Sequence, residues 1–473
     1  MYFHVLLKNI MALDIFEKKS SLEDDSRFKQ ICEDCIANKN TGRVGKEINV
    51  SLDFSIFNNS KCLRLKTAKL TALDGSVHED ELGLKLDSTN PFLITGIPKE
   101  VVKDSLPQKN IEVFLNIIYE LIDDKEHHSE EVSRNLNILS ILNPKAMFEV
   151  RDPESKEYET PHVDKNILLF DEKKGIFKSI VAASRRGRSH EHSGSYRDDN
   201  FKFEYLEDAG WYIVVISDGA GSAEYSRWGS KIVCETFCSC VKKYLQENET
   251  MKKKVSELVN AFEQPISSEE LETLKANMVT NLRSIAWRAG YEGFRAIDEE
   301  AKRKSQELEK NVESKKYAAT LLGFLLKKFG TTWLVVSVYI GDGAIAMIMP
   351  DGNLVSLSIP DGGENVGETR FVTMRNVWGS NQEEYEKNLE RRTKYAWVDD
   401  FKSIMSMSDG VSDPKFGTDN NLKSKEIWNA LWNEVQNAAS LQTANSESAD
   451  KLLEWLHFYI ESHHDDRTIA IVY

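Results

Sequence analysis

The sequence predicts a two-domain protein of mixed helices and strands, in which a small β-rich N-terminal module precedes a larger domain. The chain has 473 residues, more than one ordinary domain contains. Hydrophobic residues make up 41% of the chain, enough for a full core, and long apolar runs in its second half alternate with amphipathic stretches. We therefore expect a module at 1–122, a linker at 123–165 and the large domain at 166–473.

The module is predicted from short segments separated by turn residues, such as INVSLDFSIF at 48–57 and IEVFLNIIYEL at 111–121. The segment LGLKLDSTNPFLITGIPKE at 82–100 resembles the bacterial immunoglobulin-like domains, which implies binding or spacing and a protein partner. An unrelated β-rich extension explains the segment equally well. The apolar start at 1–16 lacks a basic beginning and a small-residue cleavage site, so we interpret it as a packed or frayed N-terminus.

The proposed linker at 123–165 is polar, charged and punctuated by proline. In the large domain, strands are expected at the apolar runs WYIVVIS (211–217), TTWLVVSVYI (331–340), FKSIMSMS (401–408) and TIAIVY (468–473). A helix over 226–245 would place Val233, Phe237 and Val241 on one face, and a second helix is expected to begin at Ser267 or Ser268.

Composition excludes several classes of function. The formal net charge of −15 argues against a nucleic-acid partner, and no apolar run is long enough for a membrane span. Six cysteines without a disulfide pattern favour a reducing compartment, so we expect a soluble cytoplasmic protein. Cys32 and Cys35 form a C-x-x-C pair without a second pair at zinc-site spacing, which packing explains better than metal.

Aspartates mark the ends of the predicted strands in the large domain. Each such acid adjoins a glycine or another acid, and a lone Asp-Gly after a strand is most often a β-turn. Several such aspartates in one domain favour a metal-binding site. The acids concerned are Asp198, Asp199, Asp218, Asp342, Asp409, Asp465 and Asp466.

If these strand ends converge, the carboxylates lose hydration and repel one another unless cations compensate. The candidate ligands are oxygen donors, which favours Mg²⁺ or Mn²⁺ over zinc. Two such ions bridged by one carboxylate suit attack on phosphorus by an activated water. Phosphoester hydrolysis is therefore the predicted chemistry.

Seven motifs occur in the order typical of the protein phosphatase 2C family, the metal-dependent serine/threonine phosphatases, and the chain resembles the bacterial branch. The motifs are SHEHSGSYRDDNF (189–201), SDGAGSAEYSRWGSK (217–231), AATLLG (318–323), YIGDG (339–343), PDGGENVGETRFVT (360–373), SDGVSD (408–413) and HDDRT (464–468). The resemblance implies an α+β fold, an αββα sandwich of two antiparallel sheets flanked by helices, with metals at one end of the sheets.

Site roles follow from the resemblance. It implies that Asp218 bridges two metal ions and that the Gly219 carbonyl binds one of them. Asp409 and Asp465 would complete the shell of one ion, and Asp198 or Asp199 would serve the other. Asp342 matches a position that in some members holds a third metal or an ordered water, which makes it a candidate catalytic residue.

Two positions depart from the family pattern. Ala220 stands where many eukaryotic members have a candidate general-acid histidine, so His190, or less favourably His192, is expected to donate a proton or orient a water. Gly194 stands where an arginine usually grips the substrate phosphate. Candidate replacements are Arg185, Arg186 and Arg188, and the sequence does not choose among them.

The predicted function is a metal-dependent phosphatase for phosphoserine and phosphothreonine on proteins, opposing a serine/threonine kinase. Two alternatives stay open: an inactive phosphatase-like binding or regulatory module, and a phosphatase for small phosphorylated molecules. A polar insertion at 375–397 is expected to shape substrate access as a flap.

Overall fold

The computed structural model divides the chain into two compact units, Met1–Glu149 and Val150–Tyr473. It describes residues 24–473 except 55, 74, 88, 90, 91, 104, 105, 124–127, 265, 362–368 and 444. The prediction for residues 1–16 therefore lies outside the described residues.

The N-terminal unit is β-rich, as the sequence predicts. Its larger sheet has the strand order β1-β10-β9-β3-β4, and a smaller sheet has the order β2-β6-β5. A helix over 24–37 buries Phe28 and Cys32 in the core between these elements. The strands are β1 (Asn40–Arg43), β2 (Ile48–Leu52), β3 (Leu63–Ala72), β4 (Val77–His78), β5 (Leu84–Asp87), β6 (Phe92–Gly96), β9 (Asn110–Asp123) and β10 (His128–Leu142), with a separate two-stranded pair, β7 (Val102–Lys103) and β8 (Leu106–Pro107), and the short helices are α2 (Ile56–Asn59) and α3 (Glu79–Leu82).

The predicted linker at 123–165 is wrong over most of its length. Residues 128–142 form β10, which pairs with β9 along its whole length and buries Leu136 and Ile138. Residues 150–162 form a strap at the start of the C-terminal unit, and it is hydrogen-bonded to the rest of that unit. Within the strap the Thr160 hydroxyl donates to the Arg197 carbonyl at 2.8 Å, and the Arg151 amide donates to the Glu191 carbonyl at 2.8 Å.

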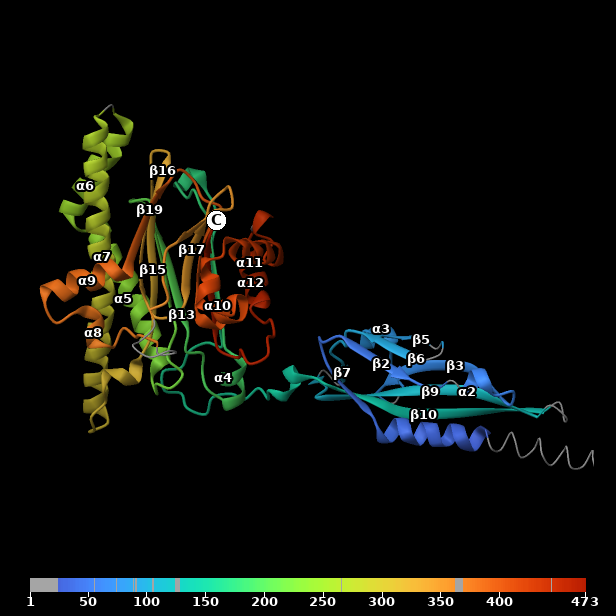
Figure 1. Cartoon of the computed structure of the whole chain (residues 1–473). Coiled ribbons are helices and arrows are strands. Elements are labelled where there is room, and N and C mark those ends of the chain that lie inside the picture. Colours follow the sequence, from blue (N-terminus) through green and yellow to red (C-terminus); the bar gives the residue numbers. More distant parts are fainter. Residues whose placement is uncertain are drawn as a thin grey trace, which may run out of the picture. The chain divides into compact units, whose positions relative to one another are not determined.

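The C-terminal unit is an αββα sandwich, which confirms the predicted fold class (Figure 1). One sheet has the order β11-β12-β21-β20-β17-β18 and the other has the order β13-β14-β15-β16-β19, with antiparallel pairing throughout. The strands are β11 (Val163–Leu168), β12 (Ile180–Arg185), β13 (Asn200–Leu206), β14 (Trp211–Ser217), β15 (Leu321–Phe329), β16 (Thr332–Ile340), β17 (Ala344–Ile348), β18 (Leu354–Ser356), β19 (Thr393–Val398), β20 (Ser403–Met407) and β21 (Arg467–Val472).

Helices cover the outer face of each sheet. Helices α5 (Ser226–Gln246), α6 (Glu249–Glu263) and α7 (Ser268–Glu307) pack on the β13–β16 side, and α11 (Lys425–Ala438) and α12 (Ser448–Trp455) pack on the other (Figure 1). Helix α7 begins where predicted, because Ser267 caps it together with Glu270. Helix α5 buries Val233, Phe237 and Val241 as predicted. The shorter helices are α4 (Arg188–Ser193), α8 (Arg375–Trp378), α9 (Gln382–Arg392) and α10 (Asp409–Phe416).

The central strands carry continuous apolar runs because both of their faces are covered. Val214 and Ile216 of β14 face the other sheet, and Ile213 and Val215 face the helices. All seven residues of β14 are buried. The sheet ends at Ser217, so the next residue, Asp218, leaves the core at the edge where the candidate site lies.

Candidate functional site

Three predicted aspartates meet at one end of the sandwich. Asp218 follows β14, Asp342 follows β16, and Asp409 follows β20 at the start of α10. One side-chain oxygen atom of each lies within 4.8 Å of the others. Because β14 and β16 belong to one sheet and β20 to the other, the cluster spans both layers.

Hydrogen bonds with Thr320 fix the backbone of Asp218 at the end of β14. The Thr320 hydroxyl accepts a hydrogen bond from the Asp218 amide at 2.9 Å, and the Thr320 amide donates to the Asp218 carbonyl at 2.8 Å. A side chain at Gly219 would approach the Asp198 carbonyl oxygen to 2.7 Å, so glycine alone fits there. The AATLLG motif thus anchors the strand end that carries Asp218.

Electrostatics make this cluster costly without a counter-charge. Two carboxylates about 5 Å apart repel by about 3 kcal/mol at an effective dielectric constant of about 20. Burial and the neighbouring Asp409 raise the pKa of Asp218 well above its usual value. Burial and the charge of Asp342 raise the pKa of Asp409 to about 7, although a hydrogen bond with Asp218 opposes the shift. A bound cation would relieve this repulsion.

A second group lies around Asp466, which the sequence analysis counted among the strand-end acids without giving it a role. Its Oδ1 accepts from the Gly187 amide at 2.6 Å and from His190 Nδ1 at 3.0 Å, and its Oδ2 accepts from the Asp198 amide at 2.5 Å. Asp466 is 2% exposed, whereas its neighbour Asp465 is exposed. Burial acts to raise the pKa of Asp466, but the hydrogen bond from His190 lowers it below its usual value. Asp466 therefore holds two loops together as a charged acceptor.

His190 lies between two acids. Its Nδ1 donates to Asp466, and its Nε2 lies 3.7 Å from Asp198 Oδ2. Burial lowers the pKa of His190, but the hydrogen bond and charge of Asp466 outweigh burial and raise it to about 9. His192, the less favoured candidate, is exposed.

Asp198 and Asp199 are both buried but differ in their partners. Asp199 Oδ2 accepts from the Ser408 hydroxyl at 2.8 Å and the Thr468 hydroxyl at 2.6 Å. Asp198 Oδ2 accepts from the Ser226 hydroxyl at 3.0 Å. Burial raises the pKa of Asp198 to about 6 and that of Asp199 well above its usual value.

The acids fit a divalent metal centre by their unused oxygen atoms. Oδ1 of Asp198, Asp199 and Asp409 is buried and has no hydrogen-bond partner within the described part of the chain. Buried oxygen atoms of this kind are rare unless an ion or a water completes them. The donor set is all oxygen, as Mg²⁺ and Mn²⁺ prefer. The structure thus brings the predicted ligands to one end of the sandwich, and their individual roles stay predictions.

Several positions were missed or only partly assigned from the sequence. Ser408 and Thr468 lie inside quoted motifs, SDGVSD and HDDRT, yet only the aspartates of those motifs were assigned. Of the three candidate phosphate-gripping arginines, Arg186 is buried and donates to the carbonyls of Arg151 and Ser195. The predicted flap at 375–397 is also partly core, because Trp378 is buried and β19 pairs with β16.

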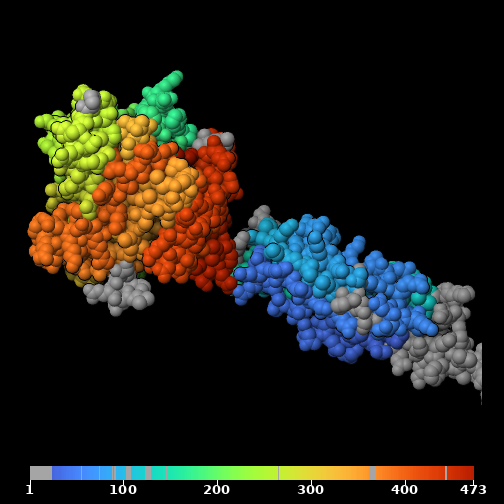
Figure 2. All heavy atoms as spheres, turned by 45° about the horizontal axis from the view of Figure 1, so that its top comes forward, coloured from blue at the N-terminus to red at the C-terminus, as the bar shows by residue number. Residues whose placement is uncertain are grey.

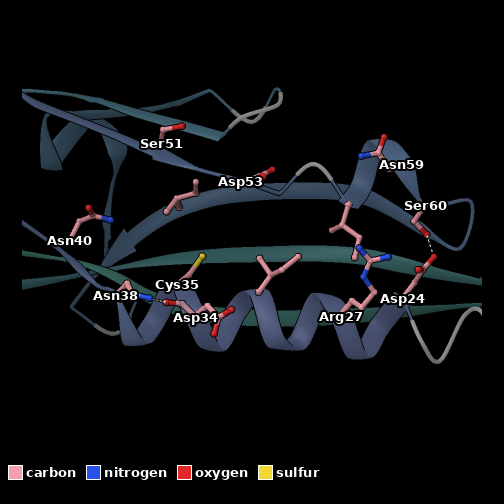
Figure 3. Close-up of a pocket in the computed structure, with 13 residues that line it drawn as sticks. Asp24, Arg27, Asp34, Cys35, Asn38, Asn40, Ser51, Asp53, Asn59 and Ser60 are labelled. Carbon is pink, nitrogen blue, oxygen red and sulfur yellow. Dashed lines mark hydrogen bonds between the residues drawn. The ribbon is translucent and has the colours of Figure 1, made fainter.

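The N-terminal unit holds a separate polar cleft of about 600 Å³ between helix 24–37 and the β2 region (Figure 3). Asp24, Arg27, Asp34 and Asp53 line it. The predicted protein partner of this unit stays a prediction. Within the described part of the chain, no helix combines the length and apolarity needed to cross a bilayer.

A family model and several solved structures match the C-terminal unit. The model of the family described as protein phosphatase 2C matches residues 186–457, more than half of the chain. A search of curated sequences finds no match. Similar solved structures include RsbX in complex with magnesium, at 13% identity over 65% of this chain and 98% of that chain, with a TM-score of 0.33. The catalytic domain of the serine/threonine phosphatase PstP with two manganese ions is similar at 14% identity over 62% of this chain and 96% of that chain, with a TM-score of 0.32. Stp1 from Staphylococcus aureus is similar at 12% identity over 62% of this chain and 93% of that chain, with a TM-score of 0.33.

Proposed function

Because the chain belongs to the protein phosphatase 2C family, we propose that it is a metal-dependent phosphatase that hydrolyses phosphoserine and phosphothreonine on proteins. The observation that supports this most is the set of buried, unpartnered carboxylate oxygens beside the clustered strand-end acids. By this reaction the enzyme would reverse the action of a serine/threonine kinase.

The residues that would hold two Mg²⁺ or Mn²⁺ ions are Asp218, the Gly219 carbonyl, Asp409 and Asp465, with Asp198 or Asp199. Asp198 is the better of the last two, because two hydroxyls already occupy one oxygen of Asp199. Bound divalent ions supply the positive charge that stabilises the transferring phosphoryl group and acidifies water. Asp342, which accepts a hydrogen bond from the Thr369 hydroxyl, would orient a water or serve a third ion.

His190 is proposed as the proton donor to the leaving oxygen. Asp466 holds its Nδ1 proton, which leaves Nε2 on the side of Asp198 and the acid cluster. A histidine that keeps its proton at neutral pH can protonate an alkoxide leaving group. His190 would then take the role of the histidine that many eukaryotic members have at the position of Ala220.

The test is phosphate release from a phosphothreonine peptide in Mn²⁺ or Mg²⁺ against EDTA. Asp218→Asn is expected to lower turnover by about a hundredfold or more, because loss of even an outer-shell partner of a metal costs 10- to 100-fold. The matched control is Asp208→Asn, an exposed acid in the β13–β14 turn. Folded protein without metal-dependent release on any substrate would contradict the proposal in favour of a binding module, and equal turnover of nucleotides would favour a small-molecule phosphatase.

A further inference from the structure

Three arginines converge on one buried carboxylate at the end of α9. Arg392 Nε lies 2.6 Å from Asp361 Oδ2, Arg391 Nη2 lies 3.2 Å from Asp361 Oδ1, and Arg370 Nε lies 3.8 Å from the same Oδ1. Asp361 is 2% exposed. Among the described residues, it is the one acid within 4 Å of these guanidinium groups.

The partners are unequally satisfied. Arg392 is buried, and it donates to both oxygens of Asp361 and to Asn388 Oδ1, so it anchors the end of α9. Arg370 lies beyond hydrogen-bond range of Asp361, and its buried Nε has no hydrogen-bond partner among the residues that the structure describes. Arg391 donates one hydrogen bond to Asp361 while its side chain is 58% exposed. Arg370 and Arg391 therefore keep donors for an anion.

The arginines lie next to the catalytic acids. The Asp361 amide donates to the Gly341 carbonyl at 2.8 Å, and Gly341 precedes Asp342. On the other side, Arg370 follows Thr369, whose hydroxyl donates to Asp342. The residues around α9, orange in Figure 2, lie at the surface of the C-terminal unit.

On the basis of the proposed phosphatase activity, we propose that Arg370 and Arg391 form an anion-binding subsite for an acidic group that flanks the phosphoresidue of the protein substrate. Guanidinium groups bind carboxylate and phosphoryl oxygens in paired hydrogen bonds. The unpartnered acid oxygens that would hold the metal ions, and with them the target phosphate, belong to Asp198, Asp199 and Asp409. The exposed Arg391 is therefore available to a neighbouring side chain of the peptide. The subsite selects substrates with glutamate, aspartate or a second phosphate beside the target residue.

The experiment compares the KM of four substrates: para-nitrophenyl phosphate, a phosphothreonine peptide with neutral flanks, and the same peptide with glutamate or with phosphoserine flanks. Arg391→Gln is expected to raise the KM of the acidic-flank peptides by about three- to tenfold, the loss of one exposed charge-assisted contact. The kcat and the KM of the other two substrates stay unchanged, and Arg391→Lys restores part of the loss. The flank that loses more identifies the preferred anion.

Arg370→Gln is expected to act in the same direction, and Arg391, being exposed, keeps the test valid if the Arg370 variant folds poorly. Arg295→Gln on α7 is the control, since Arg295 is 53% exposed and pairs with Glu292 and Glu299. Equal KM changes for neutral and acidic peptides, or no change for either, would overturn the subsite. Fluorescence anisotropy of a glutamate-flanked peptide on the wild-type and Arg391→Gln proteins needs no turnover, so it tests the subsite even if the phosphatase proposal fails.

Discussion

Asp466 and Asp409 are the same residue type at neighbouring strand ends, yet their surroundings are opposite. Asp466 precedes β21 and accepts from two backbone amides and His190 at 3.0 Å or less, which lowers its pKa. Asp409 follows β20, faces other acids and keeps a buried oxygen without a partner, and burial raises its pKa to about 7. The first environment is built for a permanent anion, and the second is incomplete without a cation.

This difference gives a rule for separating two roles that the sequence does not distinguish. An acid whose oxygens are filled by protein donors stabilises the fold, and an acid with empty oxygens among like charges is available for a ligand.

Asp466→Ala should lower the free energy of unfolding by about 3 to 5 kcal/mol, because it leaves buried amides and a charged histidine without their acceptor. Asp465→Ala, at the exposed neighbouring acid, should leave stability nearly unchanged while reducing metal-dependent turnover. Urea unfolding and phosphate release measure the two effects. Similar stability losses in both variants would break the rule.

Thr468→Val should cost about 1 to 3 kcal/mol, because Asp199 loses one of its two hydroxyl donors inside the core. The control is Thr273→Val on the exposed face of α7, whose hydroxyl bonds to its own helix. Chemical denaturation of the two variants provides the comparison. A loss no larger than the control would mean that the Thr468 contact contributes nothing.

Asp409→Asn should have effects of opposite sign with and without metal. In EDTA at pH 8 the variant should be more stable by about 1 kcal/mol, because one charge leaves a repelling cluster. In Mn²⁺ it should lose much of the metal-dependent rise in Tm, which for a ligand at 100 times its Kd corresponds to about 2.7 kcal/mol. Thermal unfolding in both buffers, with Asp208→Asn as control, checks both signs. A variant that is less stable in EDTA would contradict the repulsion argument.

Lys327 extends the comparison to a buried cation. Burial lowers the pKa of Lys327 to about 8, and its Nζ donates to the Ala209 carbonyl at 2.8 Å. The unfolded chain binds this proton up to a pH near 10.5, so stability should rise as the pH increases from about 8 toward 10. Relative to Lys327→Met, the wild type should gain about 2 kcal/mol between pH 7.5 and 9.5. Urea midpoints that run parallel across this range would contradict the shift.

Much of the C-terminal fold was predictable because its strands are covered on both faces. WYIVVIS at 211–217 coincides with β14, and α7 begins at the predicted capping serine. Strand β10 was missed because its many polar residues, including the exposed Glu131, Ser133 and Asn135, give the segment the composition of a linker, although alternation with apolar residues is itself a strand pattern. Its long antiparallel pairing with β9 makes it a strand, and that contact is not local.

The candidate site was predictable only in part, for a related reason. The aspartates of the cluster are visible as strand-end residues, but Asp465 and Asp466 are adjacent and chemically identical in the sequence. Their difference comes from Gly187 and Asp198, which are more than 260 residues away along the chain. The convergence of the arginines on Asp361 was not predicted, because the motif at 360–373 contains Asp361 and Arg370 whereas Arg391 comes from α9.

The strap at 150–162 changes where a shortened form of the C-terminal unit should begin. Family motifs start near residue 186, and a shortened protein designed from them would begin after the strap. Such a protein would lose two hydrogen bonds: the one that the Thr160 hydroxyl donates to the Arg197 carbonyl, and the one that Arg227 donates to the Tyr158 carbonyl. Arg197 directly precedes Asp198, so the truncation would loosen the loop that carries a candidate ligand. We therefore expect a stable C-terminal fragment to start at about residue 150, at the boundary between the two compact units.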